Sequence, residues 1–380
     1  MSEPNDPYSV FDPCIWKKDD MYYSLSVGRK SVGPDNKPVR ANYLFRSKDL
    51  ANWEFMHPFV EEDRFTRVGD DGACPYFWPI RDRYIMPFFS HTSGGQYLLG
   101  DYDKSRDKFV VTNHGKFNFG AVGPGGVHAP SAVPDGNGGL IIIFNMNPGK
   151  PTVGWNQIMS LPRRLTMIEE NEIGMEPYGD IESLRYGYQQ VDAMTLPANE
   201  EIVFKNIKGN ALEIIAEIDP KDAQMIEMNV LRSPKKEEYT RIVFQKDRGK
   251  RKIRPYGTDV PRQPDSVLSK ARNVYESLIT IESSYSSVLP DVRSRAPETG
   301  PIVLEQDETL KLRIFIDKSV VEVFANGRQC VAQRVYPGLE ESVGVSLRSQ
   351  RSESQPLSLE AWQMKSIYEQ NEGFVANLLE

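Results

Sequence analysis

The sequence predicts an all-β protein with two domains. Through the first half of the chain, short segments rich in apolar and aromatic residues alternate with turns of Gly, Asp and Asn, as short antiparallel strands do. From about residue 191 the expected strands are longer and alternate apolar with polar residues, which is typical of strands with one buried face. A chain of 380 residues is long enough for two domains with separate hydrophobic cores.

The first half is typical of a β-propeller, in which each blade is a short antiparallel sheet and closure of the ring removes exposed strand edges. Polar residues and glycines interrupt the strand pattern between residues 166 and 179, so we predict a propeller over residues 1–168 and a linker over residues 169–190. The clearest strands of this half are Tyr22–Leu25, Tyr43–Arg46, Tyr84–Phe89, Gln96–Leu99 and Leu140–Phe144.

The second half predicts a β-sandwich over residues 191–372. Its expected strands include Glu201–Phe204, Ala211–Ile218 and Ala223–Leu231. Near the end of this half, the apolar alternation that begins at Leu312 leads to Asn326 and Gly327. Because Asn-Gly between two apolar runs is the strongest short-range signal of a β-hairpin, we expect paired strands on either side of this turn.

The charge and hydropathy of the chain exclude several classes of function. A formal net charge of -7 and a pI of about 5.4 suit the chain poorly to a phosphate backbone, so we expect no nucleic-acid partner. The apolar run Gly139–Phe144 is too short to cross a bilayer and predicts a buried strand, so no membrane span is expected. The first residues lack the basic start and apolar centre of a signal peptide. We therefore expect a cytoplasmic protein, unless a segment upstream of Met1 carries a signal.

Cysteine and histidine spacing indicates no metal site and no cofactor. The three cysteines are scattered and do not suggest a disulfide framework. The four histidines (His57, His91, His114 and His128) are dispersed, and no Cys or His spacing fits a metal site. The basic stretch Lys246–Pro264 could bind an anion, but a charge run of this kind is more often a solvated loop.

Several short segments carry distinctive motifs. They are FDP at Phe11–Pro13, DGACPYF at Asp71–Phe77, YLLGDYD at Tyr97–Asp103, the segment Gly154–Leu165 and the long segment Leu312–Pro337. In these motifs and their order the chain resembles glycoside hydrolase family 32, which contains invertases, levanases and inulinases. The resemblance implies a five-bladed β-propeller followed by a C-terminal β-sandwich. It also implies a β-fructofuranosidase that cleaves sucrose or fructans.

The same resemblance implies three catalytic carboxyl groups. A retaining glycosidase uses one carboxylate as nucleophile and one carboxylic acid as proton donor, about 5 to 5.5 Å apart. In the family, the nucleophile is the Asp of a W-M-N-D-P-N-G segment, the Asp of R-D-P stabilises the transition state, and the Glu of E-C-P is the acid/base. Asp12 stands at the R-D-P aspartate, although Phe11 replaces the arginine that would hydrogen-bond a sugar hydroxyl.

Ala73 stands where the family has its acid/base glutamate, and a methyl group cannot transfer a proton. The nearest replacements are Asp70 and Asp71. Residues two apart on a strand share a face, so Asp71 is expected to point the same way as Ala73 while Asp70 points the opposite way. We therefore predict Asp71 as the surrogate acid, with a simple polar turn at residues 70–72 as the alternative.

The nucleophile motif has no clear counterpart. Asn5–Pro7 mimics its core, but Asp6 lies so close to Asp12 that one short segment would have to supply two neighbouring blades. The resemblance therefore implies that residues 1–168 are blades three to five. We expect either a fragment or a subunit whose propeller is completed by a second chain, because an opened propeller exposes strand edges that invite pairing.

Four residues near the motifs are candidates for substrate binding. The rings of Trp78 and Trp155 could stack on the C–H faces of a sugar, although core packing is the alternative for large aromatics. His128 stands where relatives carry a tyrosine in a similar A-P segment and is predicted at the mouth of the pocket. Cys74, next to the motif proline, is predicted to contact the substrate, with the role of a small buried apolar residue as the alternative.

Three functions fit these observations. The first is a retaining β-fructofuranosidase whose activity is incomplete in this chain alone. The second is a non-catalytic carbohydrate-binding or interaction protein that kept the fold and lost its acids, which Ala73 favours. The third is a related glycosidase with another sugar specificity, because Phe11 and Ala73 lie where the fructose ring would be recognised. Fold alone does not decide among them, and we predict the first.

Overall fold

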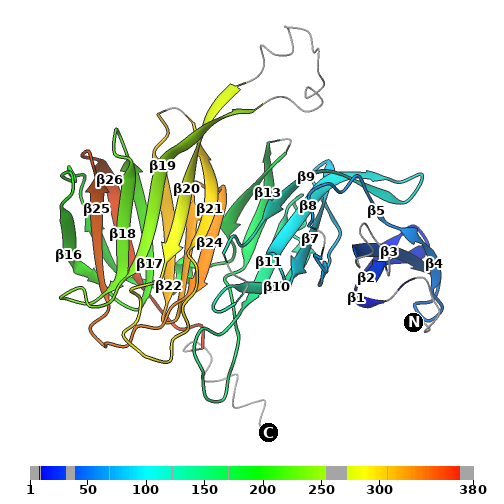
Figure 1. Cartoon of the computed structure of the whole chain (residues 1–380), viewed down its shortest axis with the longest axis horizontal. Helices are drawn as coiled ribbons and strands as arrows, with labels where there is room; N and C mark the ends of the chain where they lie inside the picture. The colour runs from blue at the N-terminus through cyan, green and yellow to red at the C-terminus, as the bar shows by residue number, and fades with distance from the viewer. Residues whose placement is uncertain are drawn as a thin grey trace. The chain divides into compact units, whose positions relative to one another are not determined.

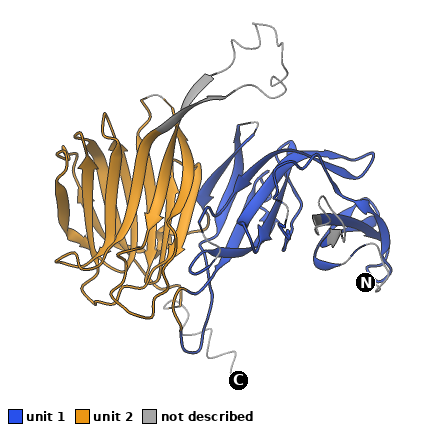
Figure 2. Cartoon of the chain, viewed as in Figure 1, with its two compact units in different colours: residues 1–148, 152–177 blue, residues 149–151, 178–380 orange. Residues whose placement is uncertain are grey.

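The chain divides into two compact units (Figure 2). Unit 1 comprises residues 1–148 and 152–177, and unit 2 comprises residues 149–151 and 178–380. The computed structural model describes residues 8, 10–30, 39–67, 69–120, 123–169, 171–253, 272–305 and 307–368. Apart from the short 3-10 helix η2 (Glu182–Leu184), the regular elements in these ranges are strands, which confirms the all-β prediction. Within the same ranges, no helix has the length and apolarity needed to cross a lipid bilayer.

The described strands of unit 1 form three successive sheets (Figure 1). The first has the order β1-β2-β3-β4, the second β5-β9-β8-β7-β6, and the third β10-β11-β13-β14 with β12 paired to β11. Only β5 pairs in parallel, with β9, among the pairs of described strands. The strands of the first two sheets are β1 (Phe11–Lys18), β2 (Met21–Lys30), β3 (Val39–Ser47), β4 (Glu54–Pro58), β5 (Val60–Glu61), β6 (Trp78–Ile80), β7 (Arg83–Ser90), β8 (Gly94–Asp103) and β9 (Lys108–Lys116). Those of the third are β10 (Val127–Pro134), β11 (Leu140–Met146), β12 (Ile158–Met159), β13 (Arg163–Glu169) and β14 (Glu172–Pro177).

Each sheet of unit 1 packs on the next, as propeller blades do. Aromatic side chains form most of the core between the first and second sheets, and the Phe59 ring lies 4.8 Å from Phe77 and 6.2 Å from Phe109, centroid to centroid. Between the second and third sheets, Phe117 packs on Phe144 at 5.1 Å. These meanders are the predicted blades, and burial of large rings between them is their main source of stability.

Gly100 lies at an irregularity in the pairing of β8 with β9, where the two backbones approach closely. A methyl group at this position would overlap the carbonyl oxygen of Val110, a backbone atom that cannot rotate away. We expect Gly100→Ala to destabilise the chain by about 1–3 kcal/mol through overpacking. Gly95→Ala on the same strand is the control, because its methyl group would meet Phe117 at an ordinary 3.4 Å. Thermal unfolding of the two variants tests this, and equal melting temperatures would contradict it.

Unit 2 is a sandwich of two antiparallel sheets, as predicted. The first sheet contains, in spatial order, β15 (Arg185–Val191), β26 (Gln355–Met364), β17 (Ala211–Asp219), β22 (Leu310–Asp317), β23 (Val320–Ala325) and β24 (Gln329–Arg334). The second contains β16 (Glu201–Lys208), β25 (Gly344–Gln350), β18 (Met225–Arg232), β19 (Thr240–Ile253), β20 (Arg272–Glu282) and β21 (Glu298–Leu304). The core lies between the sheets and includes Ile214 and Val323 from the first and Met228 and Leu347 from the second, all fully buried.

The predicted hairpin at Asn326 and Gly327 is confirmed. These two residues and Arg328 join β23 to β24, and Asn326 and Gly327 have φ angles of 50° and 64°. Glycine, and among the other residues asparagine, tolerates this left-handed region best, which explains why these residue types stand here.

The boundary between the domains differs from the predicted linker over residues 169–190. β14 (Glu172–Pro177) pairs with β13 as a strand of unit 1, and β15 (Arg185–Val191) pairs with β26 as a strand of unit 2. β15 is an edge strand whose side chains are mostly exposed. An edge strand that buries little carries few apolar residues, so its sequence resembles a linker.

The basic stretch Lys246–Pro264 was expected as a solvated loop, and that expectation is wrong for its first part. Residues up to Ile253 belong to β19, which pairs with β20. The remainder of the stretch, residues 254–264, lies outside the described residues.

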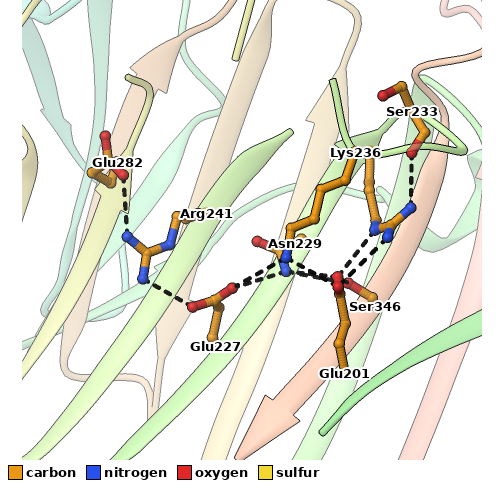
Figure 3. A network of polar contacts seen from close by, with 9 residues as sticks. Glu201, Glu227, Asn229, Ser233, Lys236, Arg241, Glu282 and Ser346 are labelled. Atoms are coloured by element: carbon orange, nitrogen blue, oxygen red, sulfur yellow. Dashed lines mark hydrogen bonds and ion pairs between the residues drawn. The ribbon is translucent and has the colours of Figure 1, made fainter. Parts of the chain in front are cut away.

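A polar network covers the outer face of the second sheet of unit 2 (Figure 3). Ile226 and Met228 point into the core. Glu227 and Asn229 alternate with them along β18 and therefore point to the opposite face of the sheet. Both are nevertheless buried, because long basic side chains lie over them. The Glu201 carboxylate accepts hydrogen bonds from Ser346 at 2.6 Å, Arg232 at 3.0 Å, Lys236 at 3.0 Å and Asn229 at 3.2 Å.

Candidate functional site

Asp12 projects from a β-bulge in β1. The register with β2 shifts between Phe11 and Cys14, and Asp12 has a φ of 50°. The Ser26 hydroxyl holds the bulge by accepting from the Phe11 N–H at 3.0 Å and donating to the Phe11 carbonyl at 2.8 Å. A bulge re-aims the side chain that it carries. The exposed Asp12 carboxylate consequently reaches the segment that precedes β6, where its Oδ2 accepts the backbone N–H of Cys74 at 2.9 Å.

Cys74 lies between the two motif aspartates. Its Sγ is 3.8 Å from Asp12 Oδ2. Burial, together with the negative charges of Asp12 and Asp71, raises the pKa of the Cys74 thiol to about 11. The thiol is therefore neutral near pH 7. Because the carboxylates of Asp12 and Asp71 both act on this thiol, the three residues belong to one cluster.

Asp71 is bound by His91, a residue that was not predicted as part of the site. The Asp71 Oδ1 accepts the His91 backbone N–H at 2.9 Å, and Oδ2 lies 2.6 Å from His91 Nδ1. The Asp71 side chain is 13% exposed and the His91 side chain 60% exposed. The carboxylate is thus largely covered, whereas the imidazole is exposed to solvent.

The geometry assumed for Asp70 and Asp71 was wrong, although the two do lie in different surroundings. Neither belongs to a strand, and Gly69 and Gly72 have φ angles of 97° and 65°, so the segment leaves the extended conformation on both sides. Ala73 makes only an isolated bridge to Phe89. The alternating faces of a strand therefore do not apply here.

Asp70 is buried and holds the turn that carries His91. Its carboxylate accepts from Ser90 at 2.7 Å, from Thr92 at 3.2 Å, from Ser93 and from the Arg67 N–H at 2.8 Å. Burial alone would raise the pKa of Asp70, but these hydrogen bonds outweigh it and lower the pKa below its ordinary value. Asp70 is thus an ionised anchor for the turn after β7.

His128 enters the cluster from the start of β10. A register shift follows it in the pairing with β11, and Ala129 has a φ of 38°. The His128 ring lies 4.4 Å from the Phe89 ring and 5.6 Å from the His91 ring, both edge to face. Burial lowers the pKa of His128, and the charge of His91 lowers it further against a smaller opposing effect of Asp71. His128 is therefore neutral near pH 7.

The structure brings four of the predicted site residues together: Asp12, Asp71, Cys74 and His128. It adds His91, for which the only sequence signal is a polar residue two positions after the end of the predicted strand Tyr84–Phe89. Within the described ranges, no group of three or more His, Cys, Asp or Glu side chains is arranged to hold a metal ion.

The two predicted tryptophans are placed differently. Trp78 belongs to β6, packs against the aromatic core of unit 1 and donates its indole N–H to the Ala132 carbonyl at 2.9 Å. Trp155 is 47% exposed in the segment between β11 and β12, where its carbonyl accepts from the Thr152 hydroxyl. A sugar contact of either ring stays a prediction. Asp6, the sequence candidate for the nucleophile, lies outside the described residues.

Comparison with known proteins identifies relatives that match most of the chain. The sucrose-6-phosphate hydrolase of Staphylococcus xylosus is 24% identical over 369 residues, which cover 90% of this chain and 63% of that protein. The fructan 1-exohydrolase of Leymus chinensis is 25% identical over 83% of this chain and 58% of its own length. The chain thus spans less than two thirds of the length of these relatives.

Solved structures show the same fold. Fructan 1-exohydrolase IIa from Cichorium intybus has a TM-score of 0.74 at 16% identity and covers 96% of this chain and 75% of its own. The sucrose-6-phosphate hydrolase from Lactobacillus gasseri has a TM-score of 0.70 at 18% identity, over 96% of this chain and 68% of its own. Two family models match consecutive parts of the chain: the glycosyl hydrolases family 32 N-terminal domain at residues 1–177 and the family's C-terminal domain at residues 180–363. Because these matches together extend over most of the sequence, the chain belongs to glycosyl hydrolase family 32.

Proposed function

We propose that this chain is a glycosidase of the β-fructofuranosidase type, which acts on sucrose or fructans with net retention. Membership of the family and the names of the relatives, sucrose-6-phosphate hydrolase and fructan 1-exohydrolase, support this substrate class. The observation that carries the proposal is the hydrogen bond from the Cys74 N–H to the Asp12 carboxylate. It joins the two motif segments that would have to act on one sugar.

Asp12 is proposed to stabilise the transition state. The glycosidic transition state resembles an oxocarbenium ion, so a carboxylate near the anomeric carbon lowers its energy. The Asp12 carboxylate is exposed and can meet a sugar, while the backbone donor of Cys74 fixes the position of one of its oxygens. Asp71 is proposed to serve the proton-transfer side of the same reaction, together with the imidazole that it binds.

Asp12→Asn is expected to lower kcat/KM on the order of 10²-fold, the loss found when one electrostatic group that acts on the transition state is removed. Asparagine keeps the size of the side chain and can still accept from the Cys74 N–H, so the fold should survive. Asp19→Asn is the matched control, because Asp19 is exposed in a left-handed turn that asparagine tolerates. The measurement is fructose release from sucrose, levan and inulin by the purified chain. Unchanged turnover by Asp12→Asn would contradict the role given to Asp12.

A second function is favoured by one observation, the methyl group of Ala73 at the position of the family's acid/base residue. A protein that kept the fold but lost proton transfer would bind fructose or fructans without hydrolysing them. Isothermal titration of the same chain with sucrose and inulin separates the two functions. Binding without fructose release would replace the glycosidase by this carbohydrate-binding protein.

A further inference from the structure

The Asp71 and His91 pair has the geometry of an oriented imidazole. A carboxylate has no hydrogen to donate. The nitrogen that lies 2.6 Å from it, His91 Nδ1, is therefore the one that bears the hydrogen of this bond. The second contact, from the His91 backbone N–H to Asp71 Oδ1, ties the carboxylate to the same residue. Both Asp71 oxygens are thus engaged, and the tautomer and direction of the ring are fixed.

This arrangement makes Asp71 a poor proton donor to a substrate. Transfer of a proton from its carboxyl group would require one of the two His91 contacts to be broken, and the side chain is 13% exposed. The His91 side chain is 60% exposed, and with Nδ1 turned to Asp71 the opposite ring nitrogen, Nε2, is the one available to a ligand. An imidazole held by a carboxylate in this way is a general pattern for proton transfer.

The surroundings place His91 within the cluster of motif residues. Asp71 acts electrostatically on Cys74, and Cys74 binds Asp12 through its backbone N–H. The Phe89 and His128 rings lie 5.4 Å and 5.6 Å from the His91 ring. Asp70 fixes the turn through Ser90 and Ser93 on either side of His91. The ring is therefore constrained from several elements of unit 1.

We propose that His91 is the proton-transfer group of the site and that Asp71 is the residue that positions it. The inference rests on the proposed glycosidase function and names the atom that carries the proton, Nε2. In the first step, protonated His91 gives the Nε2 proton to the glycosidic oxygen. The bond between that oxygen and the anomeric carbon breaks, its electron pair goes to the oxygen, and a carboxylate nucleophile bonds to the carbon. In the second step, neutral His91 takes a proton from the water that displaces the carboxylate.

The test compares two substrates that differ in their need for a proton. Sucrose must be protonated at its leaving oxygen, whereas β-fructosyl fluoride releases fluoride with little need of an acid. His91→Gln should lower kcat/KM about 10²-fold or more on sucrose, but less than about tenfold on the fluoride. Asp71→Asn should show the same selectivity with a smaller loss, because the imidazole remains but loses its orientation. His57→Gln, in which the replaced ring lies on β4 next to Pro58, is the control and should leave both rates unchanged.

Each result of this comparison either supports or overturns the proposed role of His91. A selective loss on sucrose supports the proposal. An equal loss on both substrates would mean that His91 only maintains the structure. An unchanged rate on sucrose would mean that His91 has no part in the reaction. Either result overturns the proposal but leaves the glycosidase function standing. Failure of the wild-type chain on both substrates would instead overturn the glycosidase function of this chain by itself, and the role of His91 in it. Added imidazole provides a second measurement, because it should restore sucrose turnover to His91→Gly only if the ring itself transfers the proton.

Discussion

Replacing Glu213 by alanine is expected to lower the free energy of unfolding by about 3–5 kcal/mol, because it leaves two partly buried guanidinium groups without their buried partner. The Glu213 carboxylate on β17 is fully buried in unit 2. Arg185 on β15 donates two hydrogen bonds of 2.7 Å to this carboxylate, and Arg313 on β22 donates one of 2.6 Å. Without Glu213, the two guanidinium groups would keep only the exposed carboxylate of Glu182 as a partner.

Glu182 provides the matched control, because it belongs to the same cluster but is exposed. Its carboxylate lies 2.6 Å from Arg313 and 3.6 Å from Arg185, and its side chain is 49% exposed. An exposed ion pair contributes about 0–1 kcal/mol, so Glu182→Ala should change stability little. Urea denaturation followed by circular dichroism measures both variants. Similar losses for Glu182→Ala and Glu213→Ala would show that burial of Glu213 is not what matters.

The second large effect is a loss of stability in acid that depends on Glu201. Burial alone would raise the pKa of Glu201, but hydrogen bonds from Arg232, Ser346 and Lys236 outweigh burial and lower the pKa from 4.5 to about 2 (Figure 3). A carboxyl group with a lowered pKa in the folded state stabilises the protein above its unfolded pKa and loses that contribution as the pH falls toward the folded value. The stabilising effect of Glu201 should therefore be complete above about pH 4.5 and decline between there and about pH 2.

The size of this effect follows from about 1.4 kcal/mol for each unit of pKa. For Glu201 the contribution is on the order of 3 kcal/mol. Between pH 5 and pH 2.5 the unfolding free energy of Glu201→Gln should fall by roughly 2 kcal/mol less than that of the wild-type chain, measured by urea denaturation at each pH. Asp291→Asn is the control, because Asp291 pairs with Lys150 at 2.5 Å in an exposed position. An equal change of the pH dependence in Asp291→Asn would contradict a special role of the Glu201 network.

The parts of the fold that could be predicted from the sequence are those that depend on residues close together in the chain. Alternation of apolar and polar residues has the same period as a strand, so the strands β16, β17 and β18 could be predicted near their observed positions. The Asn326 and Gly327 turn could be predicted because its left-handed backbone selects those residue types. The edge strand β15 could not, because a strand with few buried side chains has no apolar pattern to detect.

The candidate site could be predicted only in part. Asp12, Cys74 and Asp71 were found because they stand in motifs, each of which is a few consecutive residues. The orientation assumed for Asp71 was wrong, because Gly69 and Gly72 turn the backbone out of the extended form that the assumption required. His91 could not be singled out, since its significance depends on a contact between the turn that follows β7 and Asp71 in the segment before β6.

The sequence by itself determined the all-β class, the two-domain organisation, the sandwich hairpin and the acidic residues that stand in motifs, because each of these follows from the order of neighbouring residues. Only the tertiary structure decided that Asp12 reaches Cys74, that Asp70 is an anchor, and that Asp71 binds His91. These contacts join segments that are distant along the chain. Their existence depends on a bulge in β1 and on the packing of successive sheets, which place side chains in ways that no short stretch of sequence specifies.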